Sequence, residues 1–104
     1  MINPQRGEVA IHVAGEARAM RLTLGALAIL EARLDAGGLV ALAERFESGG
    51  FRAGDLVALI AAGLNGAGAG VRESEVAEMA FDGGAIGAAE AASLLLAASF
   101  RGVL

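Results

Sequence analysis

With 104 residues, 56% of them hydrophobic, and a formal net charge of −4, the chain has room for one domain over residues 1–104 that buries roughly two-thirds of its unfolded surface. The eight basic residues are all Arg and are scattered along the chain, which argues against nucleic-acid binding, because phosphate neutralisation by clustered positive charge drives that binding. The absence of Cys excludes disulfides, thiolate metal sites and a cysteine nucleophile.

The first expected element is an antiparallel β-hairpin over residues 8–22. Val9, Ile11 and Val13 alternate with polar or small residues, and a short turn at residues 14–16 leads into a second alternating run that ends with Met20 and Leu22. A two-stranded hairpin is marginally stable by itself. We therefore expect its apolar face to lie on the helices that follow.

Residues 18–35 form the best-specified stretch, a strand that passes into an amphipathic helix. Thr23 is a suitable N-cap because its hydroxyl can accept a hydrogen bond from the first turn. Leu24, Leu27 and Leu34 recur at helical spacing and predict the apolar stripe of this helix. The glycines at positions 37 and 38 end it, since glycine takes the left-handed cap conformation without steric cost.

The remaining chain, to residue 100, predicts four more short helices. The second begins at residue 39, with Leu39, Leu42, Ala43 and Phe46 inward and Glu44, Arg45 and Glu47 outward. In the third, which starts near Asp55, the stripe consists of Leu56, Leu59, Ile60, Gly63 and Leu64, and residues 65–70 read as a flexible loop. The fourth covers residues 73–81 with Val76, Met79 and Ala80 buried, and the fifth covers residues 86–100. The expected fold class is α+β, a hairpin (8–22) followed by about five helices (24–100) in a small bundle.

The last helix carries more bulky apolar groups than one narrow stripe can bury. Leu94, Leu95 and Leu96 point about 100° apart on a helix, so they cannot all face one core. Either this helix is central and buried on most sides, the more common outcome, or part of it is an interaction patch. The candidate partner-binding residues are Leu94, Leu95, Leu96, Phe100, Val103 and Leu104. The hairpin edge is a second possible docking site, by strand addition.

No pattern in the sequence predicts a catalytic, cofactor or metal site, and we do not expect an enzyme. His12 is the sole histidine and has no second histidine or cysteine to complete a site. The glycines at positions 66, 68 and 70 follow a helix instead of a strand, without the Lys of a P-loop. The acids at positions 73, 75, 78 and 82 are better explained by the helix dipole than by a metal. Residues 83–100 carry Glu90 at their middle and are too short for a membrane span, and without a signal-peptide pattern we expect a cytoplasmic protein.

Four segments together resemble one known family. They are RGEV at residues 6–9, RLTLGALAILEARL at residues 21–34, an L-x-x-L-x-x-x-F helix at residues 39–46, and FRAGDLVALIAAGLNGAG at residues 51–68. The chain is similar, over roughly residues 6–82, to the small tail-assembly chaperone-like proteins of gene transfer agents and alphaproteobacterial tailed phages, some of which are labelled tail tube proteins.

The resemblance implies a non-enzymatic assembly factor whose partners are the tape-measure protein and tail-tube subunits. Proteins of this kind are thought to coat the apolar tape-measure helices and to help recruit the tube subunits. The alternative is a structural tail or connector component, and self-association is possible in either case. A literal tube subunit fits the sequence less well, because a tube ring requires a β-rich domain and only about fifteen residues here predict strand.

Overall fold

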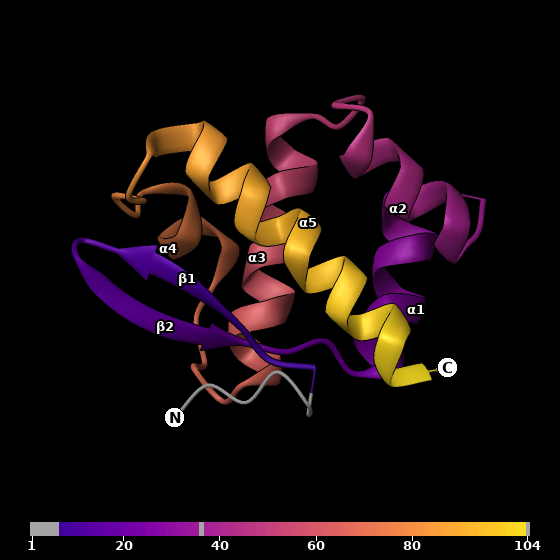
Figure 1. The fold of residues 1–104 in the computed structure, drawn as a ribbon, viewed down its shortest axis with the longest axis horizontal. Helices are drawn as coiled ribbons and strands as arrows, with labels where there is room; N and C mark the ends of the chain where they lie inside the picture. The colour runs from indigo at the N-terminus through magenta and orange to yellow at the C-terminus, as the bar shows by residue number, and fades with distance from the viewer. Residues whose placement is uncertain (1–6, 36, 104) are drawn as a thin grey trace.

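A computed structural model describes residues 7–35 and 37–103, leaving aside the side chains of residues 39 and 101–103. An N-terminal antiparallel hairpin precedes five helices, so the predicted α+β class is confirmed (Figure 1). The elements are β1 (Val9–Val13), β2 (Glu16–Met20), α1 (Leu24–Arg33), α2 (Leu39–Glu47), α3 (Ala53–Gly66), α4 (Glu73–Ala77) and α5 (Gly84–Val103).

Helix α5 crosses in front of α3, with α1 and α2 to one side of this pair and the hairpin and α4 to the other (Figure 1). The centre of the core lies where these elements meet, and its fully buried members include Met20 on β2, Leu59 and Leu64 on α3, and Leu95 on α5. The apolar face of the hairpin also lies in this core, as predicted, with Ile11 and Val13 buried.

A two-residue turn joins the strands of the hairpin, and a third segment, residues 80–82, pairs with its edge. Ala14 and Gly15 form the turn with φ values of 50° and 81°. A two-residue hairpin turn of type I′ requires a positive φ at both central residues. Phe81 pairs with Val13 across the outer edge of β1. The backbone N–H of Ala14 donates to Ala80 O at 2.9 Å and that of Asp82 donates to His12 O at 3.0 Å.

This pairing shortens the fourth helix relative to the prediction. Helix α4 ends at Ala77 instead of residue 81, and Ala80, expected to be buried, is exposed. The buried side chain of α4 is Val76. The chain leaves helical geometry because residues 80–82 hydrogen-bond to the hairpin. The periodicity of one segment carries no information about such long-range pairing.

Helix α1 presents a different stripe from the one predicted. Thr23 Oγ1 accepts a hydrogen bond from Ala26 N at 3.0 Å, which confirms the N-cap. Leu27 and Leu30 are buried, whereas the Leu24 side chain is 69% exposed. Leu24 is the first residue after the cap, and its side chain lies outside the core. The prediction that Leu24 belongs to the buried stripe was therefore wrong.

The C-terminal end of helix α3 lies close to the backbone of Arg21, which follows β2. The N–H of Arg21 donates to Gly63 O at 2.8 Å, and a Cβ added to Gly66 would lie 1.8 Å from Arg21 O. The Asn65 side chain binds both backbone groups of Val71, donating from Nδ2 at 2.9 Å and accepting at Oδ1 at 2.7 Å. Helix α3 includes residues 65 and 66, and the bonds between Asn65 and Val71 hold the two ends of the following loop together. The prediction of a flexible loop from residue 65 was therefore wrong at its start.

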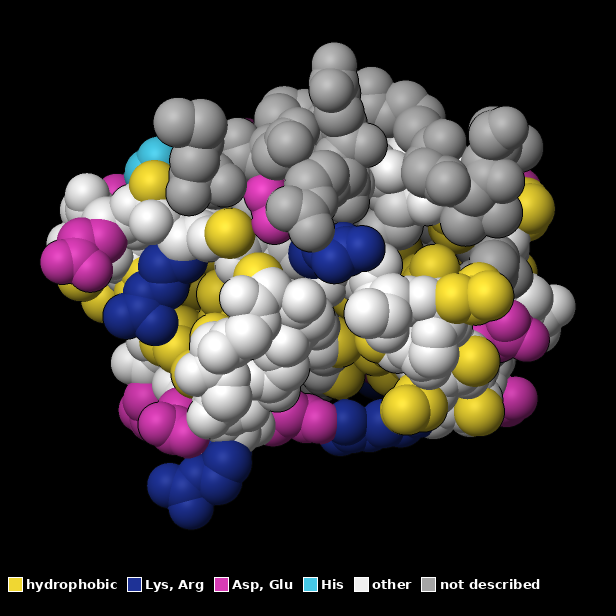
Figure 2. All heavy atoms as spheres, turned by 90° about the horizontal axis from the view of Figure 1, so that it is seen from below, with side chains coloured by type: hydrophobic (Ala, Val, Ile, Leu, Met, Phe, Trp, Pro, Cys, Tyr) yellow, Lys and Arg dark blue, Asp and Glu magenta, His cyan; other side chains and the backbone are white. Residues whose placement is uncertain are grey.

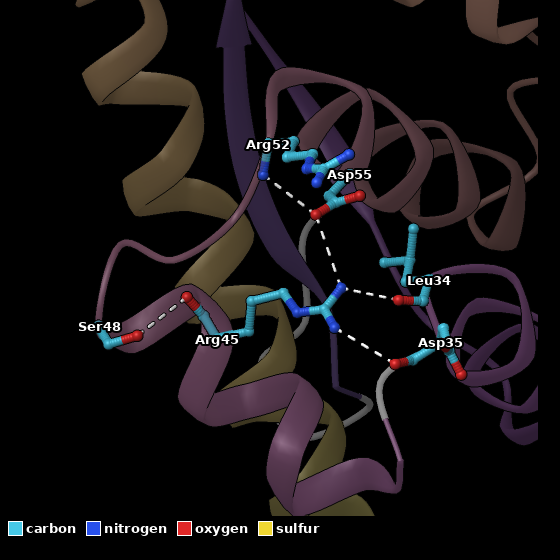
Figure 3. Close-up of polar contacts among 6 residues, drawn as sticks. All are labelled: Leu34, Asp35, Arg45, Ser48, Arg52 and Asp55. Atoms are coloured by element: carbon cyan, nitrogen blue, oxygen red, sulfur yellow. Dashed lines mark hydrogen bonds and ion pairs between the residues drawn. The ribbon is translucent and has the colours of Figure 1, made fainter.

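Arg45 joins three helices and does not point outward as predicted. From α2 its guanidinium donates to Leu34 O at 2.8 Å and Asp35 O at 3.4 Å, and it lies 3.6 Å from Asp55 Oδ2 (Figure 3). Arg45 thus meets the carbonyl end of α1 and a carboxylate in the first turn of α3, both favourable for a cation. Asp55 also accepts from Arg52 N at 3.0 Å, so the predicted role of Asp55 at this helix start is confirmed.

Candidate interaction surface

Helix α5 carries the predicted partner-binding residues, and its inner face is made mostly of small side chains. Residues 88, 91, 92 and 98 are buried alanines, and the buried Ser99 hydroxyl donates to Leu95 O at 2.7 Å. Gly63 of α3 lies opposite, where an added Cβ would come within 2.6 Å of Leu95 Cδ2. Small residues on both helices let α5 lie close to α3, which buries Leu95 and Leu96 completely.

The six predicted partner-binding residues therefore do not form one exposed patch. Leu95 and Leu96 belong to the core, Phe100 is half-buried, and Leu94 is 60% exposed. Leu104 lies outside the described residues and the side chain of Val103 is not described. In this conformation Leu94 is the member of the set that a partner could reach fully, and the assignment of the set to partner binding stays a prediction.

Leu94 continues an exposed stripe on α5 that the sequence analysis missed. Ile86, Glu90 and Leu94 follow one another at intervals of four residues, and all three are exposed, Ile86 by 73%. Residues at this spacing lie on one face of a helix, and eight residues rise about 12 Å. The four-residue interval was the signal in the sequence, but it was hidden among the many alanines of this segment.

The stripe borders a shallow groove between α2 and α5 with a volume of about 540 Å³. Its lining combines apolar side chains with two acids and one hydroxyl, from Phe46, Glu47, Ile86, Ala89, Glu90, Ser93 and Leu94. The buried Phe46 ring also stacks on Phe51, with the ring centroids 4.9 Å apart, which fixes this side of the groove. An apolar side chain with a basic neighbour would suit such a groove.

A second groove of about 600 Å³ separates α1 from α3. Small side chains of α3 and the 67% exposed Ile29 of α1 line it. At its end Arg33 forms a two-pronged ion pair with Glu73, one prong being the donation from Nη2 to Oε1 at 2.6 Å. These hydrogen bonds lower the pKa of the Glu73 carboxyl and raise the pKa of the Arg33 guanidinium. Figure 2 shows the underside of the molecule, where hydrophobic side chains emerge between charged ones on the side of α1 and α2.

Three of the four acids considered for a metal site bind separate partners. Glu73 pairs with Arg33, and the pKa of Glu75 is lowered because its carboxylate accepts a hydrogen bond from Arg72 N at 2.9 Å. Asp82 Oδ1 accepts from Gly15 N at 3.1 Å. In residues 7–35 and 37–103, no cluster of three His, Cys, Asp or Glu side chains could hold a metal ion. None of the helices described is long and apolar enough to cross a membrane.

The comparisons with known proteins identify the family. A family model described as phage tail tube protein, GTA-gp10, matches residues 6–102. No curated protein and no solved structure matches the chain. The match extends beyond the four sequence segments that carry the resemblance, which end at residue 68, and includes the whole of α4 and nearly all of α5. The chain therefore belongs to the GTA-gp10 family of phage and gene-transfer-agent tail proteins.

Proposed function

We propose that this tail protein is a non-enzymatic assembly chaperone, which acts in the bacterial cytoplasm, covers apolar helices of the tape-measure protein and helps recruit tail-tube subunits. The membership of a tail family supports the setting. In the described part of the chain the strands are two segments of five residues each, and this small amount of strand favours an assembly factor over a tube subunit.

The observation that carries the proposal is the exposed stripe of α5 beside the α2–α5 groove. Ile86 and Leu94 stay largely exposed although the chain has a well-formed core in which Leu95 and Leu96 are sealed. Large exposed apolar side chains gathered at a groove are typical of a docking site. An amphipathic helix laid into such a groove contributes apolar residues at intervals of three or four.

The charges around the groove indicate the kind of helix that fits. Glu47 on α2 and Glu90 on α5 both line it. A helix with apolar residues on one side and Arg or Lys beside them would bury the side chains of Ile86 and Leu94. Its cations would then lie near these two carboxylates. Each such contact is weak, so we expect binding through several tape-measure segments and several copies of this chain, where avidity raises the overall affinity.

The experiment is co-expression with the tape-measure protein from the same tail genes. The wild-type chain should keep that protein soluble, and Ile86→Glu and Leu94→Glu should each reduce the soluble fraction because a charge enters the apolar contact. Leu24→Glu is the matched control, since Leu24 is equally exposed but lies on α1. Circular dichroism of each purified variant checks that it is folded.

Two results would contradict the chaperone proposal. In the first, the solubility of the tape-measure protein is the same with and without this chain. In the second, the chain is retained in purified particles as a stoichiometric component, which would favour the structural tail or connector role.

A further inference from the structure

Among the residues that the structure describes, no segment pairs with the outer edge of β2. On the other side of the hairpin, the edge of β1 is covered near the turn by residues 80–82. The edge of β2 meets another segment at Arg21, whose N–H donates to Gly63 O. In Figure 1, β2 lies below β1 and its outer edge faces downward, which is the side seen in Figure 2. The N–H of Gly15, in the turn, is bonded to Asp82 Oδ1, so the open part runs from Glu16 to Ala19.

The register of the hairpin identifies the groups on this edge. Asp82 N donates to His12 O on the outer side of β1, and His12 is paired with Ala17. Opposite residues of an antiparallel pair direct their backbone groups to the same side, inward or outward, so Ala17 points outward, and so does Ala19 two residues on. Within the described part of the chain, the N–H and C=O groups of Ala17 and Ala19 have no hydrogen-bond partner.

The side chains beside these groups are self-complementary. Glu16 and Arg18 flank Ala17, and both are exposed. If a second β2 approaches antiparallel with Ala17 opposite Ala17, Glu16 of each copy lies opposite Arg18 of the other. Opposite charges at directly paired positions stabilise a sheet, and like charges destabilise it. The register centred on Arg18 would place two Arg residues opposite each other and is disfavoured.

We propose that the partner of the β2 edge is a second copy of this chain, paired antiparallel about Ala17 to give a continuous four-stranded sheet. The arrangement is a two-fold symmetric contact, in which the same edge serves both copies. It is short, because Arg21 is already bonded to Gly63, so the dimer is weak and depends on protein concentration. This inference goes beyond the proposed chaperone role and does not depend on it.

A cysteine crosslink tests the register directly, since the chain has no Cys of its own. In the proposed pairing the two Ala17 Cα atoms lie about 5.5 Å apart, within the range that a disulfide spans. Ala17→Cys should form a covalent dimer under mild oxidation. Ala19→Cys is the matched control, because it faces Gly15 of the partner and lies about 13 Å along the strand from its own counterpart. Equal crosslinking of both variants would overturn the register.

Charge reversal tests the same contact without a covalent bond. In sedimentation equilibrium, Glu16→Arg or Arg18→Glu alone should raise the dimer dissociation constant about tenfold, because two attractive pairs become repulsive. Mixing the two single variants should restore dimers, since each then faces opposite charges. Glu44→Arg, the same change of charge on the exposed side of α2, should leave the constant unchanged.

A fold check keeps the test decisive. Each variant should keep the wild-type circular dichroism spectrum, since both changed side chains are exposed. A wild-type chain that stays monomeric at every concentration would overturn the proposal. So would a dimer that is indifferent to Glu16→Arg, or a mixture of the two single variants that does not associate.

Discussion

Replacing Gly66 by Ala tests the close approach of α3 to the end of the hairpin. The new Cβ would lie 1.8 Å from Arg21 O, and real Cβ contacts below 3.0 Å essentially do not occur. The two backbone segments must therefore separate by about 1.2 Å, which stretches the hydrogen bond from Arg21 N to Gly63 O. Overpacking of this kind costs about 1–3 kcal/mol and a lost hydrogen bond about 1 kcal/mol.

Against these costs stands the better helix propensity of Ala, worth up to about 1 kcal/mol. We expect Gly66→Ala to lower the free energy of unfolding by about 2 kcal/mol and the melting temperature by about 8–16 °C. Urea unfolding followed by circular dichroism measures the first, and a thermal scan the second.

Gly54→Ala is the internal control for the same chemical change. Gly54 lies in the first turn of the same helix, and a Cβ there would meet nothing within 4 Å. This variant should be more stable than wild type by about 0.5–1 kcal/mol. If Gly66→Ala were as stable as wild type while Gly54→Ala behaved as expected, α3 would not approach Arg21 in the way described.

Three further predictions concern α5, the hairpin turn and the Arg33–Glu73 ion pair. Leu95→Ala should cost about 2–5 kcal/mol of unfolding free energy, whereas the exposed Leu94→Ala should change it by less than about 0.5 kcal/mol, and equal values in urea titrations would mean that α5 is rotated. Ala14→Asn should raise the melting temperature, with a gain of about 0.5–1 kcal/mol, because Asn adopts positive φ more readily than Ala; a lower melting temperature would contradict the turn geometry. Arg33 lowers the pKa of Glu73, so the advantage of wild type over Glu73→Gln should be fully present above pH 4.5 and should disappear as the pH falls through the lowered pKa. Urea titrations of both proteins at a series of pH values from 7 downward measure it, and a difference that does not shrink as the pH falls below 4.5 would show another cause.

Local patterns were enough to predict the elements whose environment is uniform. The α3 stripe of Leu56, Leu59 and Leu64 is buried as expected, since this helix is covered by α1, α4, α5 and β2. The Thr23 cap and the turn before β2 follow from chemistry within a few residues, and such signals can be read from the chain.

The errors arise where distant segments decide the outcome. Residues 80 and 81 were assigned to a helix from their periodicity, but residues 80–82 pair with the hairpin nearly 70 positions earlier. Arg45 has the polarity of a surface residue, yet it meets the end of α1 and Asp55. Neither the hydrogen-bond partners nor their distances could be deduced from local spacing.

The residues predicted to bind a partner lie on several sides of α5, and only part of the set is exposed. The three consecutive leucines left open whether α5 is buried on most sides or exposes a patch, and in the structure Leu94 is the one of the three that is exposed. Which of the three it would be depends on the rotation of α5 against α3, and that rotation is set by the close contact at Gly63. Ile86 and Phe46 complete the groove from positions that no pattern linked to Leu94.

The proposed docking of tape-measure helices on α5 is tested most directly by site-specific photo-crosslinking. A photoreactive phenylalanine analogue placed at Leu94 should crosslink to co-expressed tape-measure protein, while the same group at the equally exposed Leu24 on α1 should not. Crosslinking from Leu24 with none from Leu94 would place the binding surface elsewhere and contradict the account.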